Sequence, residues 1–140
     1  MKKVMVVYKS NSGNTKMMAQ AVASGAMAID TEVVLKTFDQ ASVEDIENAD
    51  SVAFGCPACG NEEIDIEVVL PFLELVKDKM ALKKTALFGS YGWGEGTYME
   101  VWYKDMMSMN AFLVDKGLTI LNTPDSGGFQ ACERLGVKLR

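Results

Sequence analysis

Five short apolar segments alternate with segments of helical periodicity along this 140-residue chain, and the alternation limits the folds open to it. The apolar segments are mainly hydrophobic throughout, as expected of parallel strands that are covered on both faces by the helices connecting them. Residues 1–140 are therefore predicted to form a single α/β domain. We expect a doubly wound, five-stranded parallel sheet with strand order 2-1-3-4-5 and helices on both faces. The predicted strands are 4–8, 32–37, 51–55, 85–89 and a fifth in two pieces, 111–114 and 118–121, broken around Gly117.

The segments between these strands carry apolar residues at helical spacing. Helices are predicted over 16–28, 98–107 and 129–139, with a short capped turn of helix at 42–45. A further helix is predicted before the fourth strand, with Pro71 as a local irregularity. Its apolar stripe consists of Ile66, Val69, Leu70, Leu73 and Val76.

Polar or glycine-rich loops follow the first, third and fourth predicted strands. Ligands of doubly wound sheets bind beyond the carboxyl ends of the strands, at the point where the strand order reverses. These three strands are neighbours in the predicted order, so their loops are expected to meet at one crevice. A binding site is predicted there.

The first of these loops, residues 10–15 (SNSGNT), has the character of a phosphate-binding loop. It joins a buried strand to a helix, whose first N–H groups and dipole favour an anion. It lacks the G-x-x-x-x-G-K-[ST] spacing, and Gly13 stands alone, so nucleoside triphosphates and dinucleotides are disfavoured. A terminal monophosphate held by neutral donors fits the loop. An ordinary helix cap built from the same residue types is the alternative interpretation.

The amino-acid composition excludes several kinds of catalytic and metal site. The chain has no histidine, which excludes His-based triads and His-containing zinc sites, and its three cysteines cannot complete a four-cysteine zinc site. No metal site is predicted, and a bound organic cofactor is the better source of reactivity. The net charge of −5 disfavours nucleic acid and anionic membranes as partners. With no apolar run long enough to span a membrane and no signal-peptide pattern, a cytoplasmic location is expected.

The glycine-rich loop after the fourth strand carries the most specific pattern. In residues 88–96 (FGSYGWGEG), glycines flank Trp93 and let the main chain approach a flat ligand, although Trp93 as core filler is an alternative. This stretch, the hydroxyl loop at 10–15 and the turn at 55–63 (GCPACGNEE) together resemble flavodoxins of the short-chain type. The likeness extends over essentially the whole chain, and the family is itself a standard example of the switch-point rule, with FMN bound there.

The resemblance implies a set of FMN contacts. The phosphate would be held by Ser10, Asn11, Ser12, Gly13, Asn14 and Thr15. Trp93 would stack on the outer face of the isoalloxazine, with Glu62 accepting a hydrogen bond from ring N3–H. The inner face and N5 edge would be lined by Pro57, Ala58, Cys59, Gly60 and Asn61, and the pyrimidine end by Ser90, Tyr91, Gly92 and Gly94.

The turn at 59–62 has a predicted redox role. One-electron reduction protonates flavin N5 and makes it a donor, so a carbonyl turned toward N5 favours the neutral semiquinone. The Gly60–Asn61 peptide can supply that carbonyl if it flips, since glycine takes positive φ at little cost. Carboxylates and the phosphate would oppose the negative charge that a second electron places on the flavin ring. The resemblance thus implies a low-potential one-electron carrier, not an enzyme, that shuttles mainly between semiquinone and hydroquinone.

Two residues depart from the family pattern. Cys59 stands where close short-chain relatives usually have methionine, and Lys9 stands where tryptophan is often found, just before the phosphate loop. Lys9 is expected to add positive charge near the phosphate. The departures bear on affinity and potential rather than on the type of function.

Three other functions compete with this interpretation. Cys56 and Cys59 have the C-x-x-C spacing of thiol–disulfide oxidoreductases, but that motif usually opens a helix, and here Gly60-Asn61 interrupts it. The simpler view is that Cys56 is buried at the strand end and Cys132 lies in the core. A flavin-dependent reductase on the same fold is a second alternative. A phospho-receiver domain is disfavoured because no acidic cluster follows the first strand.

The expected partners follow from charge. An acidic monomeric carrier would dock on redox proteins with basic surfaces, such as reductases and 2-oxoacid oxidoreductases, and Glu62, Glu63 and Glu95 are predicted to form an acidic rim near the flavin.

Overall fold

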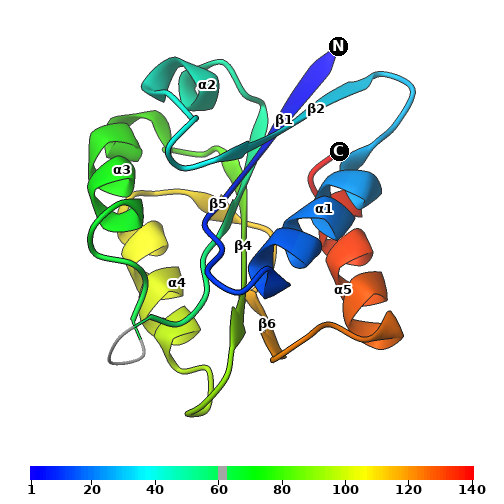
Figure 1. Cartoon of the computed structure of the whole chain (residues 1–140). Helices are drawn as coiled ribbons and strands as arrows, with labels where there is room; N and C mark the ends of the chain where they lie inside the picture. Colours follow the sequence, from blue (N-terminus) through cyan, green and yellow to red (C-terminus); the bar gives the residue numbers. More distant parts are fainter. Residues whose placement is uncertain (60–62) are drawn as a thin grey trace.

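A parallel sheet forms the centre of the molecule, as seen in the computed structural model, which describes residues 1–59 and 63–140 (Figure 1). The strands lie in the order β2-β1-β3-β4-β5, and β6 also pairs with β4. This confirms the predicted order. The strands are β1 (Lys2–Tyr8), β2 (Thr31–Thr37), β3 (Ser51–Gly55), β4 (Lys84–Tyr91), β5 (Phe112–Leu113) and β6 (Leu118–Leu121).

The fifth position of the sheet is occupied by two short strands, as the sequence predicts. β5 pairs with the start of β4 at Lys84 and Thr85, and β6 pairs with its end from Phe88 to Tyr91. The chain leaves the sheet between them and passes through Gly117.

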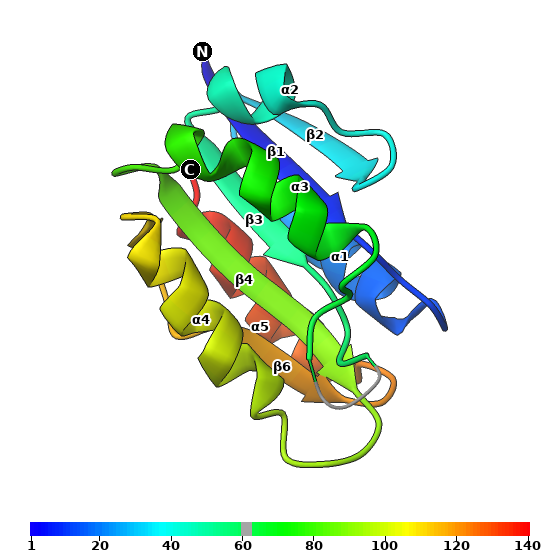
Figure 2. The same cartoon turned by 90° about the vertical axis from the view of Figure 1, so that its left-hand side faces the viewer.

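Helices cover both faces of the sheet (Figure 2). α3 and α4 pack on one face and α1 and α5 on the other, while α2 lies over the β2 end. The helices are α1 (Asn14–Ala26), α2 (Val43–Glu47), α3 (Val69–Val76), the 3-10 turn η1 (Lys77–Lys79), α4 (Tyr98–Ser108) and α5 (Ser126–Val137).

The two-sided cover explains why the strands are apolar throughout. Successive residues of β1 point to opposite faces, so Met5 and Val7 pack with α3 and α4, whereas Val4 and Val6 pack with α1 and α5. Cys132 is fully buried in the second of these cores, as expected from the sequence.

The contact between α1 and α5 depends on small residues. A Cβ on Gly136 would lie 2.1 Å from the Val22 carbonyl oxygen, and one on Gly25 would lie 2.0 Å from the Glu133 carbonyl oxygen. Real Cβ atoms do not approach backbone this closely, so the two glycines let the helix backbones meet. The pair of helices is thereby held against the sheet behind the candidate site.

Two helix starts differ from the prediction. α1 begins at Asn14 rather than at residue 16, because Gly13 turns the chain at φ +96° and the Ser10 hydroxyl accepts from the Lys16 amide at 3.3 Å. α5 begins at Ser126 rather than at residue 129, because Asp125 caps it by accepting from the Gly128 amide at 2.8 Å.

The helix before β4 also begins later than its apolar stripe indicates. Ile66 precedes α3 and is 59% exposed. Pro71 is the third residue of α3, in the first turn, where the amide it lacks has no intrahelical acceptor. Pro71 is therefore compatible with the helix.

Candidate cofactor site

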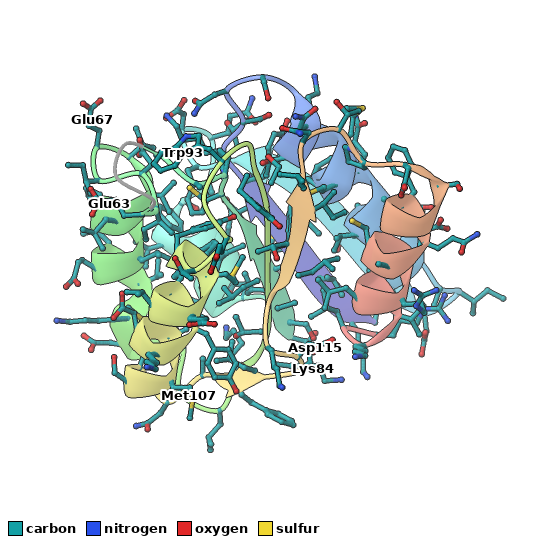
Figure 3. The ribbon with its side chains drawn as sticks, turned by 90° about the horizontal axis from the view of Figure 1, so that it is seen from below. Glu63, Glu67, Lys84, Trp93, Met107 and Asp115 are labelled. Atoms are coloured by element: carbon teal, nitrogen blue, oxygen red, sulfur yellow. The ribbon has the colours of Figure 1, made fainter. Side chains whose placement is uncertain are left out.

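The loops after β1, β3 and β4 lie together at the carboxyl edge of the sheet, which Figure 3 views from below. Backbone hydrogen bonds continue past the strands and hold the loops in register. The Lys9 amide donates to the Gly55 carbonyl at 2.9 Å, and the Ala58 amide donates to the Ser90 carbonyl at 3.0 Å. The segments that follow these three strands are thus held side by side at this edge of the sheet.

The loop at 10–15 presents a helix N-terminus to this crevice. Ser10 Oγ accepts from the Gly13 amide at 3.0 Å and holds the loop in a tight turn. At the start of α1, the Asn14 and Thr15 amides have no intrahelical acceptor, and the capping residue, Gly13, has no side chain to supply one. Free amides at the positive end of a helix dipole suit an anion such as a terminal phosphate.

Thr15 joins this loop to the one after β4. Its Oγ1 lies 2.9 Å from Ser90 Oγ, and the two residues are only 1% and 5% exposed. A buried hydroxyl pair of this kind fixes the distance between two segments 75 residues apart in sequence. The described hydrogen bond of the Thr15 side chain is therefore made to Ser90, within the protein. The sequence did not indicate this pairing.

The Trp93 side chain is exposed to solvent rather than packed in the core. It is 57% exposed on the glycine-rich loop after β4, which excludes the core-filler interpretation. Tyr91 is half-buried, while Gly92 and Gly94 are exposed on either side of the indole. An exposed aromatic ring on a loop of this kind can cover the face of a flat ligand.

The turn after β3 lies against the phosphate loop. Asn11 Nδ2 donates to Cys59 Sγ at 3.8 Å, and Cys59 exchanges two backbone hydrogen bonds with Glu63, at 2.8 and 3.0 Å. Pro57 and Ala58 connect this turn to β3. The predicted contacts of Gly60, Asn61 and Glu62 lie outside the described residues.

Comparison with known proteins gives a consistent result. A family model for flavodoxin matches residues 6–132. The flavodoxin of Megasphaera elsdenii is 37% identical over 95% of both chains, and that of Clostridium beijerinckii is 34% identical over 96% of both. The solution structure of two-electron reduced Megasphaera elsdenii flavodoxin superposes with a TM-score of 0.88 over 97% of both chains. The chain belongs to the flavodoxin family.

Flavodoxins carry electrons on FMN, and this chain is an FMN-based electron carrier. The family is a standard example of ligand binding at the β1/β3 switch point of a doubly wound sheet. The residues present fit the group, because the Asn14 and Thr15 amides at the start of α1 and an exposed indole lie at the same sheet edge. No helix in residues 1–59 and 63–140 is long and apolar enough to cross a membrane.

The two cysteines of this flavodoxin's turn differ in environment. Cys56 is fully buried at the end of β3, as predicted, whereas Cys59 is half-buried. The neighbouring Cys56 thiol lowers the pKa of Cys59 to about 7, and the Cys59 thiol, together with burial, raises the pKa of Cys56 well above its usual range. Cys59 is therefore the thiol that ionises first.

Lys9 is paired with a residue that sequence reasoning missed. Its Nζ lies 3.4 Å from Asp65 Oδ1, so its charge is directed toward the start of α3 rather than acting on the phosphate loop alone. Asp65 also accepts from the Val68 and Val69 amides, at 2.6 and 3.0 Å. Burial acts to raise the pKa of Asp65, but these amides and Lys9 outweigh it and lower the pKa. An Asp three residues before an apolar helical run was the available signal.

Proposed function

We propose that this flavodoxin is a low-potential one-electron carrier that holds a single FMN noncovalently, with residues 1–140 acting as one domain. The observation that carries the proposal is the Thr15–Ser90 hydroxyl pair, which joins the N-terminus of α1 to the loop that exposes Trp93. A phosphate and a flat ring at opposite ends of one ligand match this arrangement. FMN has that shape.

We assign the residues around the cofactor in three groups. Residues 10–15 hold the phosphate, chiefly through the amides of the first turn of α1. Trp93 covers one ring face and Ala58 and Cys59 line the other, with Pro57 behind them. Backbone groups of Ser90, Tyr91, Gly92 and Gly94 meet the pyrimidine end, and the sequence assigns Gly60 and Asn61 to the N5 edge and Glu62 to N3–H.

The low potential is expected from charge. Glu63 and Glu67 are exposed next to the turn, and the phosphate adds further negative charge at the same edge of the sheet. Each added electron must be placed near these charges, so the second reduction is opposed more strongly than the first. Lys9 offsets little of this, because it is already paired with Asp65.

The partners are expected to be basic redox proteins, including reductases and 2-oxoacid oxidoreductases, in the cytoplasm. The chain is expected to work as a monomer and not as an enzyme. Fast, short-lived encounters between complementary charges suit a carrier that must both load and unload.

A titration of apoprotein by flavin fluorescence tests the cofactor assignment. FMN should bind one per chain, and riboflavin, which lacks the phosphate, should bind at least about a hundredfold more weakly, because two or more charge-assisted hydrogen bonds of about 1.5 kcal/mol each are lost. Equal affinities would show that the loop at 10–15 does not bind phosphate.

An anaerobic reductive titration followed by absorbance tests the carrier assignment separately. Two resolved one-electron steps, with the second at much lower potential, are expected. A single two-electron step would instead favour the flavin-dependent reductase.

A further inference from the structure

The thiols of Cys56 and Cys59, in the segment after β3, share one hydrogen-bond acceptor. Each thiol donates to the same acceptor, the Pro57 carbonyl, at 3.3 Å for Cys56 and 3.4 Å for Cys59. Because both thiols donate to one oxygen atom, the two sulfurs are neighbours. A disulfide requires the two sulfurs to approach to about 2.05 Å, and both side chains already point to the same oxygen atom.

The pair is chemically asymmetric. Cys59 is half-buried, and the neighbouring Cys56 thiol and a hydrogen bond from Asn11 both lower its pKa. Burial and the charge of Asp65 act to raise the pKa of Cys59, whereas the charge of Lys9 acts to lower it. Cys56 is fully buried and contacts the Asp65 amide, which donates to its sulfur at 3.4 Å. Cys59 is therefore the nucleophile of the pair, and Cys56 is held beside it.

Cys59 lines an opening through which a small reagent can enter. A cavity of about 210 Å³ is bounded by Cys59 and by the segment from Glu63 to Glu67. Its acidic side chains are Glu63, Asp65 and Glu67, so it disfavours anionic oxidants such as the disulfide of glutathione. A liquid water molecule takes about 30 Å³, so a neutral oxidant of similar size, such as hydrogen peroxide, fits easily.

We propose that Cys56 and Cys59 form a peroxide-reactive pair, in which Cys59 is oxidised first and Cys56 closes an intramolecular disulfide. In the first step the Cys59 thiolate attacks one oxygen of hydrogen peroxide, the O–O bond breaks and hydroxide leaves, giving Cys59 sulfenic acid. In the second step Cys56 sulfur attacks Cys59 sulfur, the S–O bond breaks, and the departing oxygen leaves as water with the Cys56 proton. Overall, two thiols and one peroxide give one disulfide and two waters.

This role differs from dithiol electron transfer. The C-x-x-C lies on a loop, and in the described part of the chain the next helix after it, α3, begins at Val69. The disulfide would instead convert a damaging oxidation at the turn into a reversible one, because Cys56 consumes the sulfenic acid before a second peroxide reaches it.

Intact mass measurement on the FMN-loaded protein tests the proposal without relying on its activity. After brief peroxide treatment at neutral pH and alkylation under denaturing conditions, we expect only Cys132 to be alkylated and the unlabelled pair to be two hydrogens lighter. A thiol reductant should restore all three sites. Cys132 is the internal control, because burial raises its pKa to about 12 and it faces the α1–α5 core.

Two variants distinguish the role of Cys59 from that of Cys56. Cys56→Ala should leave Cys59 without a resolving thiol, so that Cys59 accumulates as sulfenic acid, trapped by dimedone, and then as sulfinic acid. Cys59→Ala should slow the oxidation of Cys56 by more than about tenfold, since its thiolate is disfavoured. Equal oxidation of Cys56 in the presence and absence of Cys59 would overturn the proposal. A second result would also overturn it. At a peroxide dose that oxidises Cys59 in the Cys56→Ala variant, the wild-type protein would keep all three thiols free.

Discussion

At the scale of single residues, the site depends on side chains that join its loops as much as on those that would face the cofactor. Thr15 and Ser90 form one buried link, and Asn11 and Cys59 form a second, longer one. A link of this kind fixes where the phosphate loop lies relative to the ring-binding loop. Its loss should therefore weaken cofactor binding even if neither side chain touches the cofactor.

Thr15→Val should lower FMN affinity by about tenfold, which corresponds to about 1.4 kcal/mol and is the usual cost of leaving a buried hydroxyl such as that of Ser90 unpaired. Thr15→Ser keeps the hydroxyl and is the matched control. Fluorescence titration of the two apoproteins with FMN measures the difference. If the valine variant binds FMN as tightly as the serine variant, the link does not position the loops.

The pH dependence of Cys59 is a second residue-scale prediction. Its lowered pKa means that the thiolate fraction rises with pH and is half complete at about pH 7. The rate of alkylation by a neutral reagent should rise through that pH and level off above it. Cys56→Ala removes the first cause of the lowered pKa, so the midpoint should move to higher pH. A midpoint that stays in place would show that Cys56 does not support the thiolate.

At the scale of elements, the sequence predicts what is local and misses what is brought together by folding. The strands and helices follow from apolar periodicity and the strand order from the doubly wound type of fold, and the structure confirms the order. The Lys9–Asp65 pair and the Thr15–Ser90 pair join residues 56 and 75 positions apart, and no local sequence pattern predicts contacts at such separations. The early start of α1 was missed for a similar reason, since a side-chain acceptor four residues upstream, Ser10, supports its first turn.

The close contact of α1 and α5 gives a prediction about stability. Gly136→Ala places a Cβ against the Val22 carbonyl, a backbone atom that cannot move aside, and should destabilise the fold by about 1–3 kcal/mol. Gly127→Ala in the same helix meets only the Asp125 side chain, at 3.5 Å, and should be neutral or slightly stabilising, because alanine favours helix. Chemical denaturation of the two variants measures the difference. Equal stabilities would mean that the helices can separate without cost.

At the scale of the whole molecule, charge is distributed unevenly around the site. The chain carries 19 acidic and 14 basic residues, a net charge of −5, and a bound FMN phosphate adds close to two more negative charges. Figure 3 shows Glu63 and Glu67 on the same side of the carboxyl edge as Trp93. If FMN binds beside Trp93 as proposed, electrons that enter or leave there would pass a negative surface. A basic partner would be steered to that surface in preference to the rest of the molecule.

This argument predicts a local, salt-dependent docking step. Stopped-flow electron transfer to a small basic haem protein should slow steeply as salt rises past about 0.1 M, where screening reaches about 10 Å. The double variant Glu63→Gln with Glu67→Gln should be slower at low salt and less sensitive to added salt. The matched control, Glu32→Gln with Asp78→Asn, removes two exposed charges at the opposite end of the strands and changes the net charge equally. It should keep nearly the rate of the unmodified protein. If both double variants slow the reaction to the same extent, the net charge and not the surface beside Trp93 guides the encounter.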